Sequence, residues 1–303
     1  MFGAPVDCPS SVFTELPARF RRSTRSVWAE HNKHGALLHS FLEGPCFDRQ
    51  GNLYVVDIPW GRIFRIDPGG DWSLVVEYDG WPNGLAFGRD GRLYIADYRR
   101  GILALRPGAP SVDVVLGHWR SERFKGPNDL TFADNGDLWF TDQGQTGMTD
   151  PTGRVFRLAP SGALTCLSDR VPSPNGIVLN QAQNAVLVAT RENAIWHLPI
   201  HADGATSKAR VFIQLSGGGG PDGLAMDEDD GLAVCHAGLG SVWLFSRLGE
   251  PTHRVRSCRG VSTTNLAFGG PDRRTLYITE AETGSILAAQ APRPGRPLFG
   301  DTG

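Results

Sequence analysis

The chain has 303 residues, a formal net charge of −2 and a pI near 6.4. Because the charge is near zero and Lys and Arg are scattered, we expect no polyanion-binding surface and no nucleic-acid partner. No apolar run reaches the length of a membrane helix, and the N-terminus lacks a signal-peptide pattern, so we expect no membrane partner. The five cysteines form no C-x-x-C pair and no zinc spacing, which favours a cytoplasmic location.

The first 36 residues stand outside the pattern that organises the rest of the chain. Residues 12–16 are predicted to form a short strand, which Pro17 ends. Residues 18–34 are polar and basic and could be helix or loop. We therefore interpret 1–36 as an N-terminal extension.

A repeat organises residues 37–290. Six short anchors lie 40 to 47 residues apart, and each is followed by an apolar strand, a polar turn and a second strand. The central residues of the anchors are Glu43, Asn83, Asn128, Asn175, Asp222 and Asn265. A sustained period of this size predicts a propeller or a solenoid. The Pro-rich residues 291–303 are expected to form a disordered tail.

The repeats predict an all-β fold, a six-bladed β-propeller with four antiparallel strands per blade. The sixth repeat supplies only three strands, so we expect the strand at 12–16 to complete and close the last blade and hide its unpaired edge. Aromatic residues recur in the second strand of several repeats and are expected to pack between blades: Tyr54, Tyr94, Trp139 and Tyr277.

The anchors share their chemistry, because every central residue is a carboxylate or an amide. If equivalent positions of the blades lie at one height around an axis, the six oxygen donors point toward one end of a channel. Hard divalent cations such as Ca²⁺ and Mg²⁺ prefer oxygen ligands. The alternative is that Asn, Asp and Gly occur there because tight turns require them.

A second interval connects the anchors to the ends of the second strands. Fourteen residues separate them in four repeats, so the strand ends Asp57, Asp97, Asp142 and His236 are expected to surround the anchors. The three aspartates are interpreted as turn formers. His236 could act as a base or proton shuttle, or could be a hydrogen-bonded structural residue.

Other catalytic patterns are absent from the sequence. It contains no Gly-x-Ser-x-Gly elbow, no Walker loop, no dinucleotide fingerprint and no H-E-x-x-H pair. The four glycines at 217–220 lack the Lys-Ser/Thr of a phosphate loop, so we interpret them as a flexible connection into Asp222.

Four motifs then occur in one order: Glu-Gly-Pro at 43–45, Arg-Phe-x-x-Pro-Asn-Asp at 123–129, Pro-Asn-Gly at 174–176 and Pro-Asp-Gly-Leu at 221–224. Together they resemble the senescence-marker-protein, gluconolactonase and luciferin-regenerating-enzyme superfamily. The resemblance implies a six-bladed propeller with one divalent cation, held by Glu43, Asn175 and Asp222. It also implies that Asn128 contacts the metal or the substrate.

The resemblance carries less information at three other positions. Arg123 matches a basic residue often found before the Pro-Asn-Asp motif. Asn83 and His236 have no fixed role in the family. We include Arg123, Asn83, Asn128 and His236 as candidate substrate contacts.

The expected function is that of a metal-dependent lactonase. One divalent cation (Ca²⁺, Zn²⁺, Mg²⁺ or Mn²⁺) would polarise the carbonyl of a small sugar-acid lactone while water attacks, with Asp222 as ligand and base by resemblance. Phosphotriester hydrolysis at the same site and a non-catalytic binding scaffold are the alternatives. We expect a monomer or a small homo-oligomer.

Overall fold

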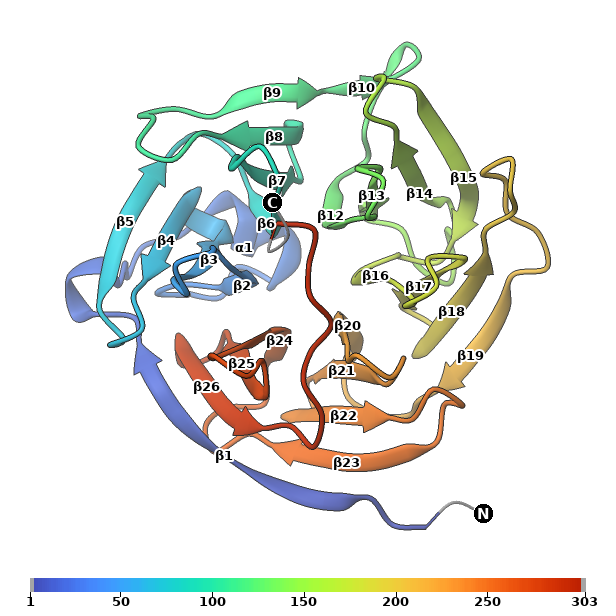
Figure 1. Ribbon diagram of the computed structural model, residues 1–303. Helices are drawn as coiled ribbons and strands as arrows, with labels where there is room; N and C mark the ends of the chain where they lie inside the picture. Colours follow the sequence, from blue (N-terminus) through green and yellow to red (C-terminus); the bar gives the residue numbers. More distant parts are fainter. Residues whose placement is uncertain (1–2, 301–303) are drawn as a thin grey trace.

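The computed structural model describes residues 3–300 and shows an all-β protein whose sheets are arranged like the blades of a propeller around a common axis (Figure 1). Four of the sheets have four strands each, in chain order. The first contains β2 (Leu42–Phe47), β3 (Leu53–Asp57), β4 (Arg62–Ile66) and β5 (Trp72–Glu77). The second contains β6 (Pro82–Phe87), β7 (Leu93–Asp97), β8 (Gly101–Leu105) and β9 (Asp113–Leu116). The third contains β12 (Pro127–Phe132), β13 (Leu138–Asp142), β14 (Gly153–Leu158) and β15 (Leu164–Val171). The fourth contains β16 (Ile177–Leu179), β17 (Ala185–Thr190), β18 (Ala194–Pro199) and β19 (Arg210–Gln214).

The remaining large sheet has eight strands and joins both ends of the chain. It contains β20 (Gly220–Met226), β21 (Leu232–Ala237), β22 (Ser241–Phe245), β23 (Pro251–Arg256), β24 (Thr263–Gly269), β25 (Thr275–Glu280), β26 (Ser285–Gln290) and β1 (Val6–Glu15). The smaller elements are a hairpin and short helices: β10 (His118–Trp119), β11 (Glu122–Arg123), α1 (Val27–Asn32), η1 (Ala18–Phe20) and η2 (Ile58–Trp60).

The N-terminal strand β1 lies between β23 and β26. Ser10–Glu15 pairs antiparallel with β26, as the short strand at 12–16 led us to expect. The strand is longer than expected, because Val6–Pro9 pairs in parallel with β23. The sequence contained no sign of this second pairing, since Val6–Pro9 is short and its partner lies almost 250 residues away.

Aromatic side chains fill the space between neighbouring sheets, as predicted. Tyr54 contacts Phe87 of the next sheet at a ring-centroid distance of 5.1 Å, and Tyr94 contacts Phe132 at the same distance. Trp139 and Tyr277 are packed in the same way against residues of adjacent sheets. The hydrophobic core is thus distributed between sheets around the axis.

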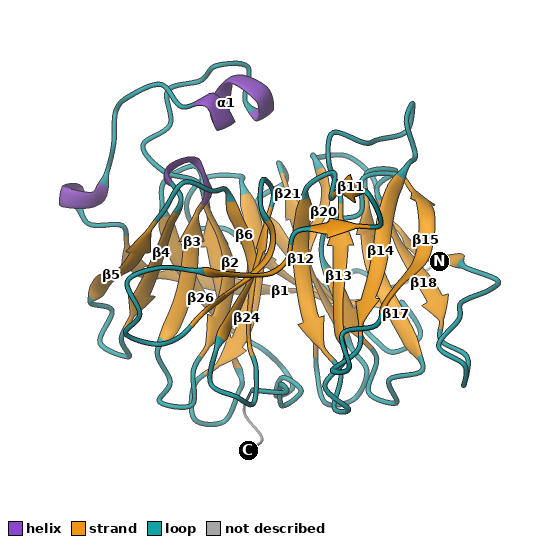
Figure 2. Cartoon of the chain, turned by 90° about the horizontal axis from the view of Figure 1, so that it is seen from above, coloured by secondary structure: helices purple, strands orange, loops and turns teal. Residues whose placement is uncertain are grey.

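The C-terminal segment crosses one end of the ring (Figures 1 and 2) and is ordered where the sequence led us to expect a disordered tail. Arg296 is its main anchor, because its side chain donates to the carbonyl oxygens of Leu179 and Asn180, both at 3.1 Å. The ring of Phe299 stacks on Phe132 at 4.9 Å. Other arginines donate to carbonyl oxygens of the segment itself, Arg273 to Gly295 at 2.9 Å and Arg49 to Gly300 at 2.7 Å, and Gly295 forms an isolated antiparallel bridge with Asp227. Residues 301–303 lie outside the described part of the chain.

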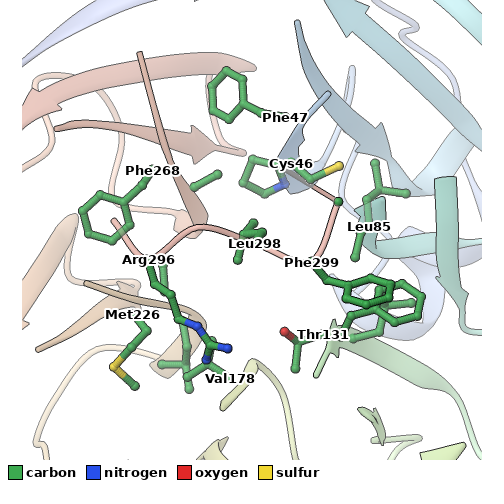
Figure 3. A pocket seen from close by; sticks show the side chains of 18 of the residues that line it. Cys46, Phe47, Leu85, Thr131, Val178, Met226, Phe268, Arg296, Leu298 and Phe299 are labelled. Carbon is green, nitrogen blue, oxygen red and sulfur yellow. The ribbon is translucent and has the colours of Figure 1, made fainter. Parts of the chain in front are cut away.

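The axial cavity under this segment is apolar. It has a volume of about 120 Å³ and is lined by the inner strands, with Leu298 and Phe299 closing it (Figure 3). At the opposite end of the axis, α1 stands above the sheets (Figure 2). Within residues 3–300, no helix has both the length and the apolar character required to cross a membrane.

Candidate active site

The sequence anchors lie in the innermost strands. Glu43 is in β2, Asn83 in β6, Asn128 in β12 and Asp222 in β20, while Asn175 lies two residues before β16. The turn interpretation is therefore wrong for the four anchors that lie within strands, whereas Asn175 lies in the connection before β16. The pairing register shifts around each anchor within a strand, which marks a β-bulge. Bulges re-aim side chains, and here they direct polar groups of strands toward one end of the axis.

Glycine follows most anchors because inner strands approach each other closely. A Cβ atom on Gly84 would lie 2.4 Å from Asp129 Oδ1, and one on Gly176 would lie 2.3 Å from the carbonyl oxygen of Asp222. Only glycine avoids these clashes. The Asn-Gly and Asp-Gly pairs are therefore requirements of packing around the axis.

The sixth anchor is shifted by one residue from the expected position. Asn265 accepts from the backbone of Leu266 at 2.8 Å, just as Asp129 accepts from Leu130 at 2.9 Å. Their backbone N–H groups also donate to equivalent threonines. Asn265 therefore matches Asp129, and Thr264 occupies the anchor position. Asp129 was not singled out in the sequence, although it replaces the glycine found in four other repeats.

Three carboxylates meet at the polar end of the axis: Glu43, Asp129 and Asp222. Glu43 and Asp129 are 3% and 8% exposed. Burial raises the pKa of Glu43 well above its usual range, and the negative charge of Asp222 raises it further. Burial also raises the pKa of Asp129 to about 7 and the pKa of Asp222 to about 6. Such a cluster favours either bound protons or a bound cation.

Amide side chains hold these carboxylates in place. Asn265 Nδ2 donates to Glu43 Oε2 at 2.8 Å, although 222 residues separate them. The Asn175 amide hydrogen-bonds Asp222 and lowers its pKa. Asn128 donates its Nδ2 to Gln143 at 2.9 Å. This bond leaves the Asn128 Oδ1 oxygen as the atom available to a cation or substrate.

Two basic residues act on the same cluster. The positive charges of Arg191 and Lys33 both lower the pKa of Asp222. Lys33 follows α1, and Arg191 follows β17 on the chain. Neither position carried a motif in the sequence, so sequence reasoning missed both.

His236 lies in β21, which pairs with β20, the strand that carries Asp222. Both of its ring nitrogens are hydrogen-bonded. Its Nε2 atom hydrogen-bonds the carbonyl oxygen of Gly217 at 2.9 Å, and its Nδ1 atom accepts from Trp243 at 3.2 Å. Burial lowers the pKa of His236, so the neutral ring that fits both bonds is favoured. This geometry supports the structural alternative. The bond from His236 to Gly217 also fixes the glycine run at 217–220, which we had interpreted as flexible.

Asp57, Asp97 and Asp142, the other strand ends, lie next to the anchors as expected, but their carboxylates are bonded within the sheets. Asp57 pairs with Leu42 across the sheet and forms a buried ion pair with Arg62. Asp97 and Asp142 are likewise buried and hydrogen-bonded to neighbouring residues.

The two remaining candidate substrate contacts differ in position. Asn83 is half-buried in β6, with its carbonyl oxygen directly beside Gly44. Arg123 is exposed in the β10–β11 hairpin, where its carbonyl oxygen accepts from Arg154, and it has no described bond to the carboxylates.

The donor set fits a hard divalent cation. Glu43, Asp129 and Asp222 supply negative charge, while Asn128 and Asn175 supply amide oxygens, and all are oxygen ligands of the kind that Ca²⁺ and Mg²⁺ prefer. Within residues 3–300, no group of three or more His, Cys, Asp or Glu side chains is arranged as a complete metal site. Any site here therefore needs the amides as ligands.

Comparison with known proteins places the chain. It is 27% identical over 290 residues to the diisopropyl-fluorophosphatase of Loligo vulgaris, covering 86% of this chain and 92% of that protein. It is 29% identical over 247 residues to the lactonase drp35 of Staphylococcus aureus, covering 77% and 73%. The structure of regucalcin from Agrobacterium tumefaciens, described as a calcium-binding protein, superposes with a TM-score of 0.75 at 21% identity, covering 98% and 99%. Residues 41–282 match the family described as SMP-30/Gluconolactonase/LRE-like region, and the chain therefore belongs to this family.

Proposed function

We propose that this protein is a divalent-metal-dependent hydrolase that opens a small lactone. The observation that carries the proposal is the meeting of Glu43, Asp129 and Asp222 in a buried site where their pKa values are raised. Holding three desolvated carboxylates together is costly unless a cation or protons compensate their charge. The lactonase relative supports the reaction class.

The residues that would hold the ion are Glu43, Asn175 and Asp222, with Asn128 as a further candidate ligand. When bound, a divalent cation would neutralise the carboxylates and stabilise negative charge that develops on the substrate carbonyl. The calcium-binding relative favours Ca²⁺ among the possible ions.

The chain's own groups would orient the substrate and accept the proton of the attacking water. Asp222 is our candidate base, because its pKa near 6 leaves it mostly deprotonated at neutral pH. Asn175 hydrogen-bonds Asp222 and so fixes the orientation of its carboxylate. Asn128, oriented by Gln143, would contact the substrate or the ion.

We interpret the eight-stranded sheet as two blades that share β1, which makes six blades in all. In this interpretation β1 closes the ring by covering β26 and extends onto the preceding blade at β23. A cytoplasmic location and a monomeric or small oligomeric state remain predictions.

Phosphotriester hydrolysis is the second candidate. It is supported by the diisopropyl-fluorophosphatase relative, which matches 86% of this chain. The same carboxylates and amides would serve either reaction, because both develop negative charge on an oxygen at the ion.

A substrate panel tests the proposal. Purified protein would be assayed on neutral and acidic sugar lactones by pH-stat, and on diisopropyl fluorophosphate by fluoride release. Each assay would be run as purified, after chelation and after readdition of Ca²⁺. We expect lactone hydrolysis that chelation removes and Ca²⁺ restores. Fluoride release without lactone hydrolysis would favour the second candidate, and hydrolysis of neither substrate would contradict both.

A further inference from the structure

The helix α1 and the residues around it form a cap above the polar end of the axis (Figure 2). Ser26 Oγ accepts from the backbone of Ala29 at 3.1 Å and begins the helix. At the other end, Gln145 Nε2 donates to Asn32 Oδ1 at 3.1 Å and to the Tyr98 hydroxyl at 2.9 Å. The cap is therefore tied to the second and third sheets.

Aromatic rings line the same end of the axis below the cap. Phe41 contacts Trp28 at 4.7 Å, and Trp81 contacts Tyr98 at 5.8 Å. Phe41 precedes β2 and Trp81 precedes β6, so both rings lie next to the strands that carry anchors. Trp28, Phe41 and Trp81 belong to one hydrophobic cluster, which packs the cap onto the first two sheets.

Lys33 joins this cap to the carboxylates. Its Nζ atom lies 4.5 Å from the centre of the Phe41 ring, and the charges of Asp222 and Glu43 act on it. The side chain is half-buried, although lysine usually extends into water. The sequence contains lysine only at 33, 125 and 208.

Arg191 provides a second positive charge at the same carboxylate. Its Nη1 atom donates to the carbonyl oxygen of Gly219 at 3.1 Å, in the glycine run that leads to Asp222. Lys33 and Arg191 come from the cap and from the fourth sheet, so they approach Asp222 from different parts of the chain.

The net charge of the site with a bound cation would favour an anion. A divalent cation would offset two of the three carboxylates, and Lys33 and Arg191 more than offset the third. The occupied site would then carry a surplus positive charge, which attracts a negatively charged group.

We propose that Lys33 is a specificity-determining residue that binds an anionic substituent, a carboxylate or a phosphate, on the lactone substrate. This inference rests on the proposed lactonase function and names its substrate class. The ammonium group is suited to this role because it is a compact charge with three donors.

The competing role for Lys33 is that of a simple counter-ion to Asp222. The two roles predict different results. A counter-ion affects every lactone equally, whereas a recognition residue affects only lactones that carry the anionic group.

The test uses two lactones that differ at one carbon. D-Glucono-1,4-lactone is neutral, and D-glucaro-1,4-lactone carries a carboxylate in place of the terminal hydroxymethyl group; 6-phosphoglucono-1,5-lactone supplies the phosphate arm. We expect Lys33→Met to lower the ratio of kcat/KM for an anionic over the neutral lactone by about tenfold or more, mainly through KM. Lys33→Arg should restore part of the ratio. Lys208→Met, an exposed lysine in a distant loop, is the matched control.

A second measurement does not depend on turnover. The three lysines would be acetylated with limiting reagent in protein supplied with Ca²⁺, with and without 6-phosphogluconate, and quantified by peptide mass spectrometry. We expect protection of Lys33 alone, and less protection by neutral glucitol. An unchanged selectivity ratio in Lys33→Met, or equal acetylation of Lys33 with and without the anion, would overturn the inference. Failure of the wild type on all the lactones would instead contradict the proposed function, and the acetylation result would then decide the inference.

Discussion

Asp222 contributes both to packing around the axis, through its backbone, and to the candidate active site, through its carboxylate. Its backbone oxygen packs against Gly176, while its carboxylate faces Asn175 and the two basic residues. Desolvation raises the pKa of Asp222, and Arg191, Lys33 and Asn175 lower it, which leaves a value of about 6. A carboxylate tuned in this way can hold a cation or accept a proton.

The substitution Asp222→Asn should remove both metal binding and activity. We expect elemental analysis to find about one divalent ion per wild-type chain and none in the variant. We expect kcat to fall by at least about a hundredfold, with an unchanged β-type far-UV spectrum. Asp229→Asn is the control, because Asp229 is an exposed acid paired with Arg293. A variant that keeps its ion and its turnover would remove Asp222 from the site.

His236 should behave as a structural residue. His236→Ala leaves the Trp243 indole N–H and the Gly217 carbonyl oxygen without their partners, so we expect a loss of about 2 to 4 kcal/mol in the free energy of unfolding. Turnover of the folded variant should stay close to wild type, with His118→Gln in the exposed β10 as the control. A hundredfold loss of kcat with full metal content and normal stability would instead identify His236 as catalytic.

The N-terminal strand β1 pairs with strands near the C-terminal end of the chain. Its second half pairs with β26, and its first half pairs with β23. Thr14 also accepts from the Trp72 indole at 3.0 Å, and Leu16 is buried after the strand ends. The strand thus connects the first sheet and the last strands of the chain.

Deleting residues 1–17 should expose the edges of β23 and β26. Because unpaired edges recruit other chains, we expect a lower melting temperature and concentration-dependent aggregation, followed by thermal unfolding and light scattering. Deleting only residues 1–5 leaves β1 whole and serves as the control. If the longer deletion melts like the full chain, β1 does not hold the last strands in place.

At the scale of the whole molecule, the axis has two different ends. The helix α1 stands over one end (Figure 2), and the carboxylates Asp222 and Glu43 act on Lys33, which follows that helix. The other end is an apolar cavity closed by Leu298 and Phe299 (Figure 3). The apolar side removes water from Asp129 and Asn265, which line both regions. Burial of the three carboxylates at the axis is the main cause of their raised pKa values.

The metal-free protein should lose stability as the pH rises. The pKa of Asp129 is about 7 in the folded chain, above its ordinary value of 3.8, so the folded state binds a proton that the unfolded state releases. Protonated Asp129 therefore adds up to roughly 4 kcal/mol to the free energy of unfolding. This contribution is complete below about pH 4 and is lost as the pH rises through 7. Melting temperatures of chelated protein should accordingly fall between pH 5 and pH 8.

Two comparisons sharpen this prediction. Asp129→Asn should flatten the fall, whereas Asp169→Asn, at an exposed position, should not. Added Ca²⁺ should raise the melting temperature more at pH 8 than at pH 5, because it replaces protons on the carboxylates. A pH-independent melting temperature in wild type would show that these carboxylates are not protonated in the folded state.

Much of the site could be predicted from the repeat. Glu43, Asn128, Asn175 and Asp222 belong to a series of anchors spaced 40 to 47 residues apart. The charge of Asp222 acts on Glu43, and Asn175 hydrogen-bonds Asp222. The pattern failed where a repeat departs from its neighbours. Asn265 was assigned to the anchor position, although the bulge shifts it to the position of Asp129. The register of a bulge depends on pairing partners, which spacing alone does not reveal.

The sequence by itself determined the order of strands, the packing of aromatic residues between sheets and the family, because alternation, turns and motifs act over a few residues. Only the tertiary structure decided what meets at the axis. Asn265 binds Glu43 across 222 residues, and Arg296 binds Leu179 across 117. The approach of Lys33 to Asp222 likewise depends on the tertiary position of the cap. Such contacts carry no local signal, because their partners are determined by how the sheets pack around the axis rather than by neighbours along the chain.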